Sequence, residues 1–237
     1  MTTLHRPLGT LAGPAGPVEL NPAEAGWSYT GLSVLDLDAG PESSLDSGDS
    51  EICILPLSSE RLTIETGEGR FHLDGRTSVF TRITDFLYVG TDTEVRISSE
   101  TGGEVALATS RCARHLPPKY GAAEDVAVEV RGGGQATRQI SNFMSPEAWD
   151  HADKLMCVEV YTPDGNWSSY PPHKHDDSPE CEVNNEEIYY FRIGDAGTTD
   201  DSRDGGGMHR TYTGDEGTGD RASDENGAVR EGDGFRI

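Results

Sequence analysis

Short apolar stretches that alternate with polar residues recur along this chain, and turn residues separate them. Alternation with a period of two is the pattern of β-strands, whose successive side chains point to opposite faces. In the first half, strands are predicted at residues 27–37, 51–57, 61–65, 71–73, 78–80, 86–89, 94–98 and 104–108. A second series covers residues 126–130, 155–161, 173–175, 187–193 and 208–213. Many short strands between turns predict an all-β fold of the barrel or sandwich type.

The two series of strands predict two units of similar length. Residues 114–125, with Pro117 and Pro118, are expected to connect a barrel at residues 26–113 with a second one at residues 126–237. Residues 1–25 contain few aromatic residues and are predicted to form a flexible N-terminal arm. One short helix is expected at residues 146–154, because Ser145 can cap it and Pro146 suits the first helical position.

The charge balance of the chain excludes two classes of partner. Its 237 residues include 42 acidic and 19 basic ones, which gives a formal net charge of −23. Such a surface repels nucleic acid and anionic membranes, so neither is expected as a partner. Acidic residues with only three lysines indicate a halophilic protein, because high salt screens the self-repulsion.

The four cysteines, Cys53, Cys112, Cys157 and Cys181, show no Cys-x-x-Cys spacing. No charged-then-apolar leader precedes them, and no apolar run approaches the length of a membrane span. The sequence therefore predicts free thiols and a cytoplasmic location.

The candidate chemistry lies in the run NWSSYPPHKHD, residues 166–176, and in the glutamates that follow it. On a strand, His173 and His175 would share one face, and only one of Glu186 and Glu187 could face them. Two histidines and a carboxylate can hold one divalent metal and leave positions open for a substrate. Zn, Mn, Fe, Co and Ni all accept these ligands, so the sequence does not identify the metal.

The longer pattern resembles the 5-deoxy-glucuronate isomerase family of myo-inositol catabolism. The resemblance rests on NWSSYPPHKHD, on EEIYYFRI at residues 186–193, and on RTYT at residues 210–213 followed by Asp224 and Glu225. Upstream it includes GRTSVF at residues 75–80, LYV at residues 87–89 and VEVYTP at residues 158–163. It implies two cupin-type barrels, which are jelly-roll-like double-stranded β-helices, with a metal site only in the second.

The resemblance also implies an activity and a metal site. The activity is a metal-dependent aldose–ketose isomerisation, from 5-deoxy-D-glucuronate to 2-deoxy-5-keto-D-gluconate. His173, His175 and Glu187 would hold one divalent metal ion, and the partner would be a small sugar acid. A metal can stabilise the negative charge that develops beside the substrate carbonyl.

Further site residues follow with less support from the pattern. Glu186, Tyr189 and Tyr212 are candidates for moving the proton between the two substrate carbons. Arg210 is a candidate partner of the substrate carboxylate, although an ion pair on an acidic surface would explain it equally well. Lys174 is a second candidate for substrate binding, but its place between the histidines, on the other strand face, favours a solvated cation.

The end of the chain departs from the family pattern. In the family, the stretch after the counterparts of Asp224 and Glu225 continues into an apolar strand and a Pro-x-Gly-x-His-Pro segment that supplies another ligand. This sequence ends at Ile237, so the second barrel is expected to be incomplete and its activity reduced. His209 stands where the family commonly has glutamine, and it is a candidate replacement ligand.

Two other functional classes stay open. A catalytically impaired homologue, or a cupin that only binds sugar acids, would bind metal without turnover. A cupin oxygenase would depend on Fe(II) and oxygen. The sequence leaves the oligomeric state open, with a homo-oligomer as one option.

Overall fold

The computed structural model describes residues 4–173, 175, 185–194, 205–212 and 224–236. Strands dominate this part of the chain, and its one α-helix, α1 (Pro22–Ala25), is a single turn. The all-β prediction is confirmed. Nowhere in these residues is there a helix long and apolar enough to span a membrane. The strands are β1 (His5–Arg6), β2 (Val18–Leu20), β3 (Thr30–Leu37), β4 (Glu42–Asp46), β5 (Ser50–Pro56), β6 (Glu60–Thr66), β7 (Gly69–Gly75), β8 (Phe86–Val89), β9 (Glu94–Ser99), β10 (Gly103–Arg111), β11 (Lys119–Gly121), β12 (Ala127–Arg131), β13 (Arg138–Asn142), β14 (Val158–Tyr161), β15 (Ile188–Tyr190), β16 (Gly207–Tyr212), β17 (Asp224–Val229) and β18 (Gly234–Arg236).

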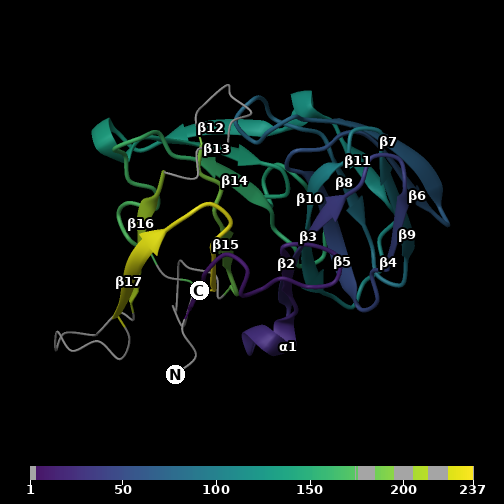
Figure 1. Ribbon diagram of the computed structural model, residues 1–237, viewed down its shortest axis with the longest axis horizontal. Helices are drawn as coiled ribbons and strands as arrows, with labels where there is room; N and C mark the ends of the chain where they lie inside the picture. The colour runs from purple at the N-terminus through teal and green to yellow at the C-terminus, as the bar shows by residue number, and fades with distance from the viewer. Residues whose placement is uncertain (1–3, 174, 176–184, 195–204, 213–223, 237) are drawn as a thin grey trace.

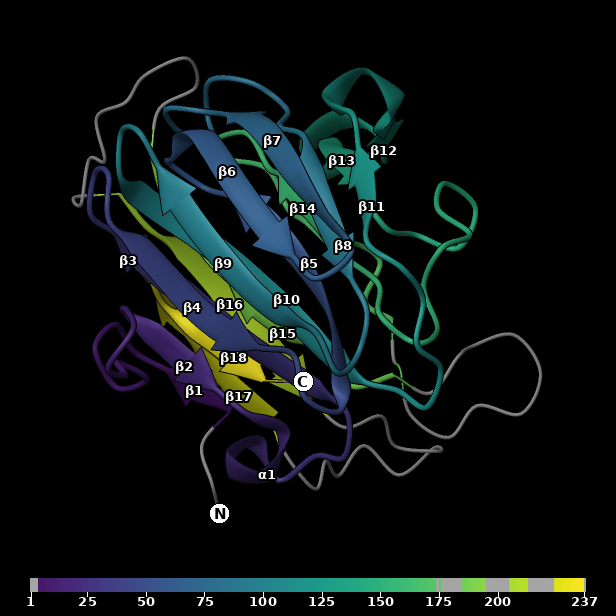
Figure 2. The same ribbon diagram turned by 90° about the vertical axis from the view of Figure 1, so that its right-hand side faces the viewer.

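Two antiparallel sheets form the first half of the molecule. One has the strand order β11-β8-β5-β10-β3-β2 and the other the order β4-β9-β6-β7 (Figure 2). Their facing sides enclose a core of aliphatic side chains, which includes Leu35, Ile54, Ile64, Ile97 and Leu107. This arrangement follows from the alternation in each strand, because every second residue reaches the space between the sheets.

The six-stranded sheet is buried on both faces. On β5, Ile52 and Ile54 belong to the core between the two sheets. The intervening Cys53 and Leu55 belong to a second core, which contains Phe143 from the second half of the chain. A strand covered on both sides carries a continuous apolar run in place of an alternating one.

Three smaller sheets make up the second half. They have the orders β12-β13-β14, β16-β17 and β1-β18-β15 (Figure 1). The N-terminal segment was expected to be a flexible arm, but its described residues are built into both halves. β2 pairs with β3 of the six-stranded sheet, and β1 pairs with β18 near the other end of the chain.

Three local predictions are wrong. Residues 146–154 form no helix; Ser145 accepts hydrogen bonds from the N–H groups of Ala148 and Trp149, which makes a single turn. Residues 78–80 form a turn, because the Ser78 carbonyl and side chain both bind backbone N–H groups that follow. No strand contains His173 or His175. In the first two cases local hydrogen bonds decided a conformation that apolar spacing alone does not specify.

Two buried charged side chains of the first half form hydrogen bonds with the second half. Arg76 has no exposed surface, and its guanidinium donates to both carboxylate oxygens of Glu159 on β14, at 3.1 and 2.5 Å. Glu51 on β5 is also fully buried. It accepts hydrogen bonds from the N–H groups of Asp153, Lys154 and Leu155 at 2.9, 2.6 and 2.7 Å. Buried charges of this kind need partners, so these contacts fix how the second half sits on the first.

Candidate metal centre

His173, His175 and Glu187 come together in the second half of the molecule. One ligand atom from each lies within 4.8 Å of the others. The Nε2 atom of His175 is 3.6 Å from the nearer carboxylate oxygen of Glu187. The two imidazole rings have centroids 4.8 Å apart and stand nearly perpendicular, at 82°. His173 is exposed, whereas His175 and Glu187 are partly buried, so solvent and small molecules can reach one side of the group.

The convergence comes from a loop and not from a strand. The carbonyl oxygen of His175 accepts a hydrogen bond from the N–H of Asn185 at 2.9 Å. This bond brings the two ends of the intervening segment together, and Glu187 follows only two residues after Asn185. The sequence pattern therefore selected three residues that do meet, although the expected strand geometry at the histidines is absent.

Glu186 fixes the backbone on which Glu187 sits. Its carboxylate accepts hydrogen bonds from the N–H groups of Ser28, Tyr29 and Thr30, at 2.7, 2.9 and 2.8 Å. Partial burial by itself would raise the pKa of Glu186, but the three N–H donors lower it below its usual value. The side chain thus ties the start of β15 to the start of β3, and its oxygens are occupied by backbone donors.

Tyr189 lies beside Glu187 and Ser169. Its hydroxyl is 3.3 Å from Ser169 Oγ. Burial, together with the negative charge of Glu187, raises the pKa of Tyr189 to about 12. The phenol is therefore protonated at neutral pH, which makes it a hydrogen-bond donor next to the carboxylate. Ser169 belongs to the run of residues 166–176, but no pattern in the sequence indicated a role for it.

His209 is packed among aromatic rings. Its ring centroid lies 4.2 Å from that of Phe235, 5.3 Å from that of Tyr189 and 5.6 Å from that of Phe191. Its Nε2 atom is 2.9 Å from Thr211 Oγ1. Burial, and then the nearby His5, lower the pKa of His209. Among the described residues, the group of ligand atoms within 4.8 Å does not include His209.

Two of the remaining candidates, Arg210 and Tyr212, lie on β16. Arg210 is exposed on β16, and its guanidinium carbon is 5.1 Å from the centre of the Tyr212 ring. Tyr212 is partly buried at the end of the same strand. Lys174 falls outside the described residues.

The donor set fits a divalent metal ion. Metal–ligand bonds of about 2.1 Å place neighbouring ligand atoms about 3.0–3.5 Å apart. The 3.6 Å separation between His175 and Glu187 is close to this value. The ligand atoms of all three residues lie within 4.8 Å of one another, a spacing that small side-chain rotations can close. Nitrogen and carboxylate donors suit the first-row transition metals.

Comparisons with known proteins agree with this geometry. The model of the KduI/IolB family matches residues 8–235. The chain belongs to this family. The 5-deoxy-glucuronate isomerase of Geobacillus kaustophilus is 34% identical over 219 residues, which cover 91% of this chain and 74% of that protein. The enzyme of the same name from Bacillus licheniformis is 37% identical over 214 residues, which cover 89% of this chain and 76% of that protein.

A solved structure shows the same fold in the KduI/IolB family. An IolB-like protein from Salmonella typhimurium LT2 superimposes with a TM-score of 0.86 at 30% identity, covering 100% of this chain and 84% of that one. The predicted resemblance to the 5-deoxy-glucuronate isomerase family is therefore confirmed, and so is membership of a family of isomerases.

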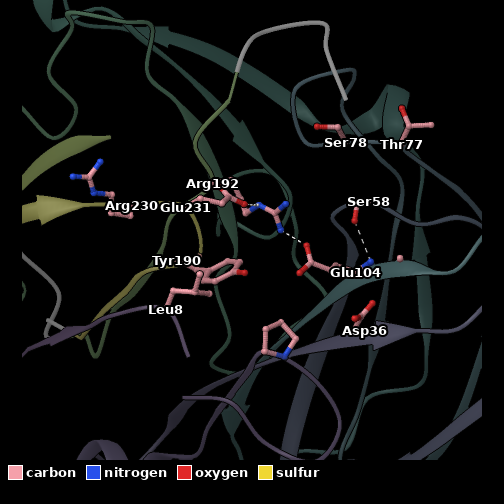
Figure 3. A pocket seen from close by; sticks show the side chains of 13 residues that line it. Leu8, Asp36, Ser58, Thr77, Ser78, Glu104, Tyr190, Arg192, Arg230 and Glu231 are labelled. Atoms are coloured by element: carbon pink, nitrogen blue, oxygen red, sulfur yellow. Dashed lines mark hydrogen bonds and ion pairs between the residues drawn. The ribbon is translucent and has the colours of Figure 1, made fainter. Parts of the chain in front are cut away.

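A separate cavity of about 440 Å³ lies between the two halves of this KduI/IolB family member (Figure 3). Arg192 reaches across it to Glu104 of β10, with which it forms a short ion pair. A second ion pair, at 2.5 Å, joins Arg192 Nε to Glu231. Burial alone would lower the pKa of Arg192, but Glu104 and Glu231 raise it. Tyr190 lines this cavity, whereas Tyr189 lies beside Glu187. Successive residues of β15 therefore face the cavity and the candidate metal centre.

Proposed function

We propose that this chain is a metal-dependent aldose–ketose isomerase that converts 5-deoxy-D-glucuronate to 2-deoxy-5-keto-D-gluconate. The observation that carries the proposal is the meeting of His173, His175 and Glu187 within 4.8 Å in a chain of the KduI/IolB family. Relatives named 5-deoxy-glucuronate isomerase supply the substrate and the reaction.

The ligands are assigned from their placement and chemistry. His173 and His175 would bind through neutral imidazole nitrogens, and Glu187 would bind through its carboxylate. A divalent metal in this group would act as a Lewis acid toward the oxygens of the substrate. The open, exposed side of His173 leaves room for the substrate to approach.

Tyr189 is assigned as a proton donor or positioning group. Its protonated phenol can donate a hydrogen bond to Glu187 and orient the carboxylate. Glu186 is a poor candidate for the proton shuttle, because its oxygens already accept three backbone N–H groups. We keep Tyr212 as a further candidate for proton transfer.

Substrate binding is assigned to a positively charged side chain. A sugar acid is an anion, and the net charge of −23 repels it, so a local cation must offset the field of the whole chain. Exposed Arg210 has a planar fork of donors that suits a carboxylate. Lys174 stays a second candidate for this role.

The test is isomerase turnover measured together with metal content on the purified 237-residue chain in high salt. The expected result is about one divalent metal per chain and turnover without oxygen, both lost in Glu187→Gln. Metal binding without turnover would instead support a sugar-acid-binding or catalytically impaired homologue. Turnover that requires Fe(II) and oxygen would support an oxygenase.

A further inference from the structure

The β12 strand is an open sheet edge with exposed apolar side chains. Within the described part of the chain it is hydrogen-bonded to β13 alone, and all five of its residues are exposed. Val130 is 71% exposed, the largest value among the exposed large apolar residues that the structure describes, and Val128 is 47% exposed. Edge strands normally carry charged side chains, proline or a bulge that blocks further pairing. In β12 the two charged side chains, Glu129 and Arg131, pair with each other. The sequence of β12, Ala-Val-Glu-Val-Arg, contains neither lysine nor proline.

Further exposed apolar residues gather around the same sheet. They are Met156, Val158 and Val160 on or beside β14, and Trp167 and Tyr170 in the segment that contacts the β12–β13 hairpin. Val158 and Val160 lie on the same face as Glu129 and Arg131, because Val160 is paired through Ile140 with Glu129, whereas Val128 and Val130 lie on the other face. The sheet lies at the outside of the molecule, away from the four-stranded sheet (Figure 1).

The charges on β12 complement a second copy of the same strand. Glu129 and Arg131 lie two residues apart on one face and form an ion pair at 2.8 Å. In an antiparallel pair, residues directly opposite each other lie on the same face of the sheet. When a two-fold axis relates two copies of one strand, the axis must therefore pass through a residue, which then lies opposite its own copy. With the axis at Val130, each Glu129 lies opposite the Arg131 of the other copy, and Val130 lies opposite itself.

Axes at Glu129 or at Val128 match the charges less well. An axis at Glu129 would place two carboxylates directly opposite each other, which destabilises an antiparallel pair. An axis at Val128 would leave Arg131 without an opposite residue in β12. The register centred on Val130 places two opposite-charge pairs on one face and a valine pair on the other.

We propose that two copies of this chain pair through β12, antiparallel and with the two-fold axis at Val130, to form one continuous sheet β14-β13-β12-β12-β13-β14. The partner is a second copy because the strand is complementary to itself in charge. The contact is isologous, so it closes as a dimer. High salt screens the repulsion between two chains of charge −23 and thereby favours the pairing.

The first experiment uses charge exchange. Sedimentation equilibrium of the intact chain in high salt should give a mass that corresponds to two copies. Glu129→Arg and Arg131→Glu should each raise the dissociation constant by about tenfold or more, because they place like charges opposite each other. The double variant restores opposite charges and should restore the dimer. Glu42→Arg is the matched control, since Glu42 lies on another edge strand, β4, and also pairs with an arginine, Arg96.

The second experiment tests the register. Val130→Cys should form an intermolecular disulfide under copper–phenanthroline oxidation, because residues directly opposite have Cα atoms about 4.5–5.5 Å apart. Val128→Cys should not, since its two copies would be about 13 Å apart along the strands. The wild-type chain, oxidised in parallel, gives the background from the native cysteines. A monomer at all salt concentrations, a dimer unaffected by both charge variants, or no cross-link at Val130 would overturn the proposal.

Discussion

The carboxylates of Glu186 and Glu187 have entirely different partners, although the two residues are adjacent. Glu186 binds the backbone N–H groups of Ser28, Tyr29 and Thr30. Glu187 lies 3.6 Å from His175 Nε2. One glutamate thus anchors the start of β15, and its neighbour completes the candidate metal centre.

This division predicts separable effects of two similar substitutions. Glu187→Gln should weaken metal binding by more than about 100-fold while leaving the unfolding free energy of the metal-free chain nearly unchanged. Glu186→Gln should leave three N–H donors with one suitable acceptor and lower the unfolding free energy by about 1–3 kcal/mol. Metal titration and urea unfolding measure the two effects.

The matched control for Glu186 is Glu100→Gln. Glu100 pairs with Arg61 on the surface, where both side chains are more than half exposed, and the change should cost less than about 1 kcal/mol. Equal destabilisation by Glu186→Gln and Glu100→Gln would contradict the anchoring role.

Histidine substitutions should distinguish the histidines that bind the metal from a histidine that does not. His173→Ala and His175→Ala should each reduce the metal bound per chain at limiting concentration. His209→Gln should leave metal stoichiometry unchanged, because His209 packs among Phe191, Phe235 and Tyr189 and lies outside the ligand group. Elemental analysis after dialysis measures the result. Loss of metal in His209→Gln would identify it as a ligand.

Tyr189→Phe removes the hydroxyl that lies beside Ser169 and Glu187. We expect a loss of about 10–100-fold in metal affinity or turnover, because outer groups that orient ligands have effects of this size. Ser169→Ala removes only the contact between Ser169 and the Tyr189 hydroxyl, so it should reduce metal affinity or turnover by less. Isothermal titration with metal, followed by kinetics at saturating metal, separates the two effects. An unchanged Tyr189→Phe variant would remove this residue from the site.

Removing Glu159 should be strongly destabilising. Glu159→Gln leaves the guanidinium of Arg76 fully buried without a charged partner. Breaking a buried ion pair in this way costs about 3–5 kcal/mol. Urea unfolding of the variant measures the loss, and Arg61→Ala on the surface serves as the control. A loss below about 1 kcal/mol would show that the pair does not hold the two halves together.

Stability should fall in alkaline solution. Burial, followed by Asp85, raises the pKa of Tyr120 to about 12. Burial also raises the pKa of Tyr190 to about 12, with Glu104 and Glu231 adding to the shift against the opposing effect of Arg192. Unfolded tyrosine titrates near about 10. The folded state therefore holds its phenolic protons where the unfolded state loses them, so the stabilisation is complete below pH 10 and is lost as the pH rises toward 12.

Urea midpoints between pH 9 and pH 11.5 measure this effect. Tyr190→Phe should reduce the slope of stability against pH in that range. A slope identical to that of the wild-type chain would show that Tyr190 does not contribute.

The all-β class was predictable from local pattern, but several elements were not. Alternating segments and short apolar runs predicted β3, β5, β6, β8, β9 and β10 with small errors at their ends. β1, β2, β11 and β18 are only two or three residues long. Strands this short exist because a neighbouring strand supplies their hydrogen bonds, and that neighbour is distant in sequence. The same reason explains the N-terminal segment, where His5 pairs with Phe235.

The sequence by itself determined the chemistry of the candidate site. The types and spacing of His173, His175 and Glu187 suffice to indicate a metal, because ligand chemistry belongs to the side chains. Only the tertiary structure decided that Glu186 binds backbone N–H groups, that Ser169 and Tyr189 stand beside Glu187, and that His209 lies outside the ligand group. These are distances between residues far apart in the chain, and they depend on how distant strands pair and how the two halves pack.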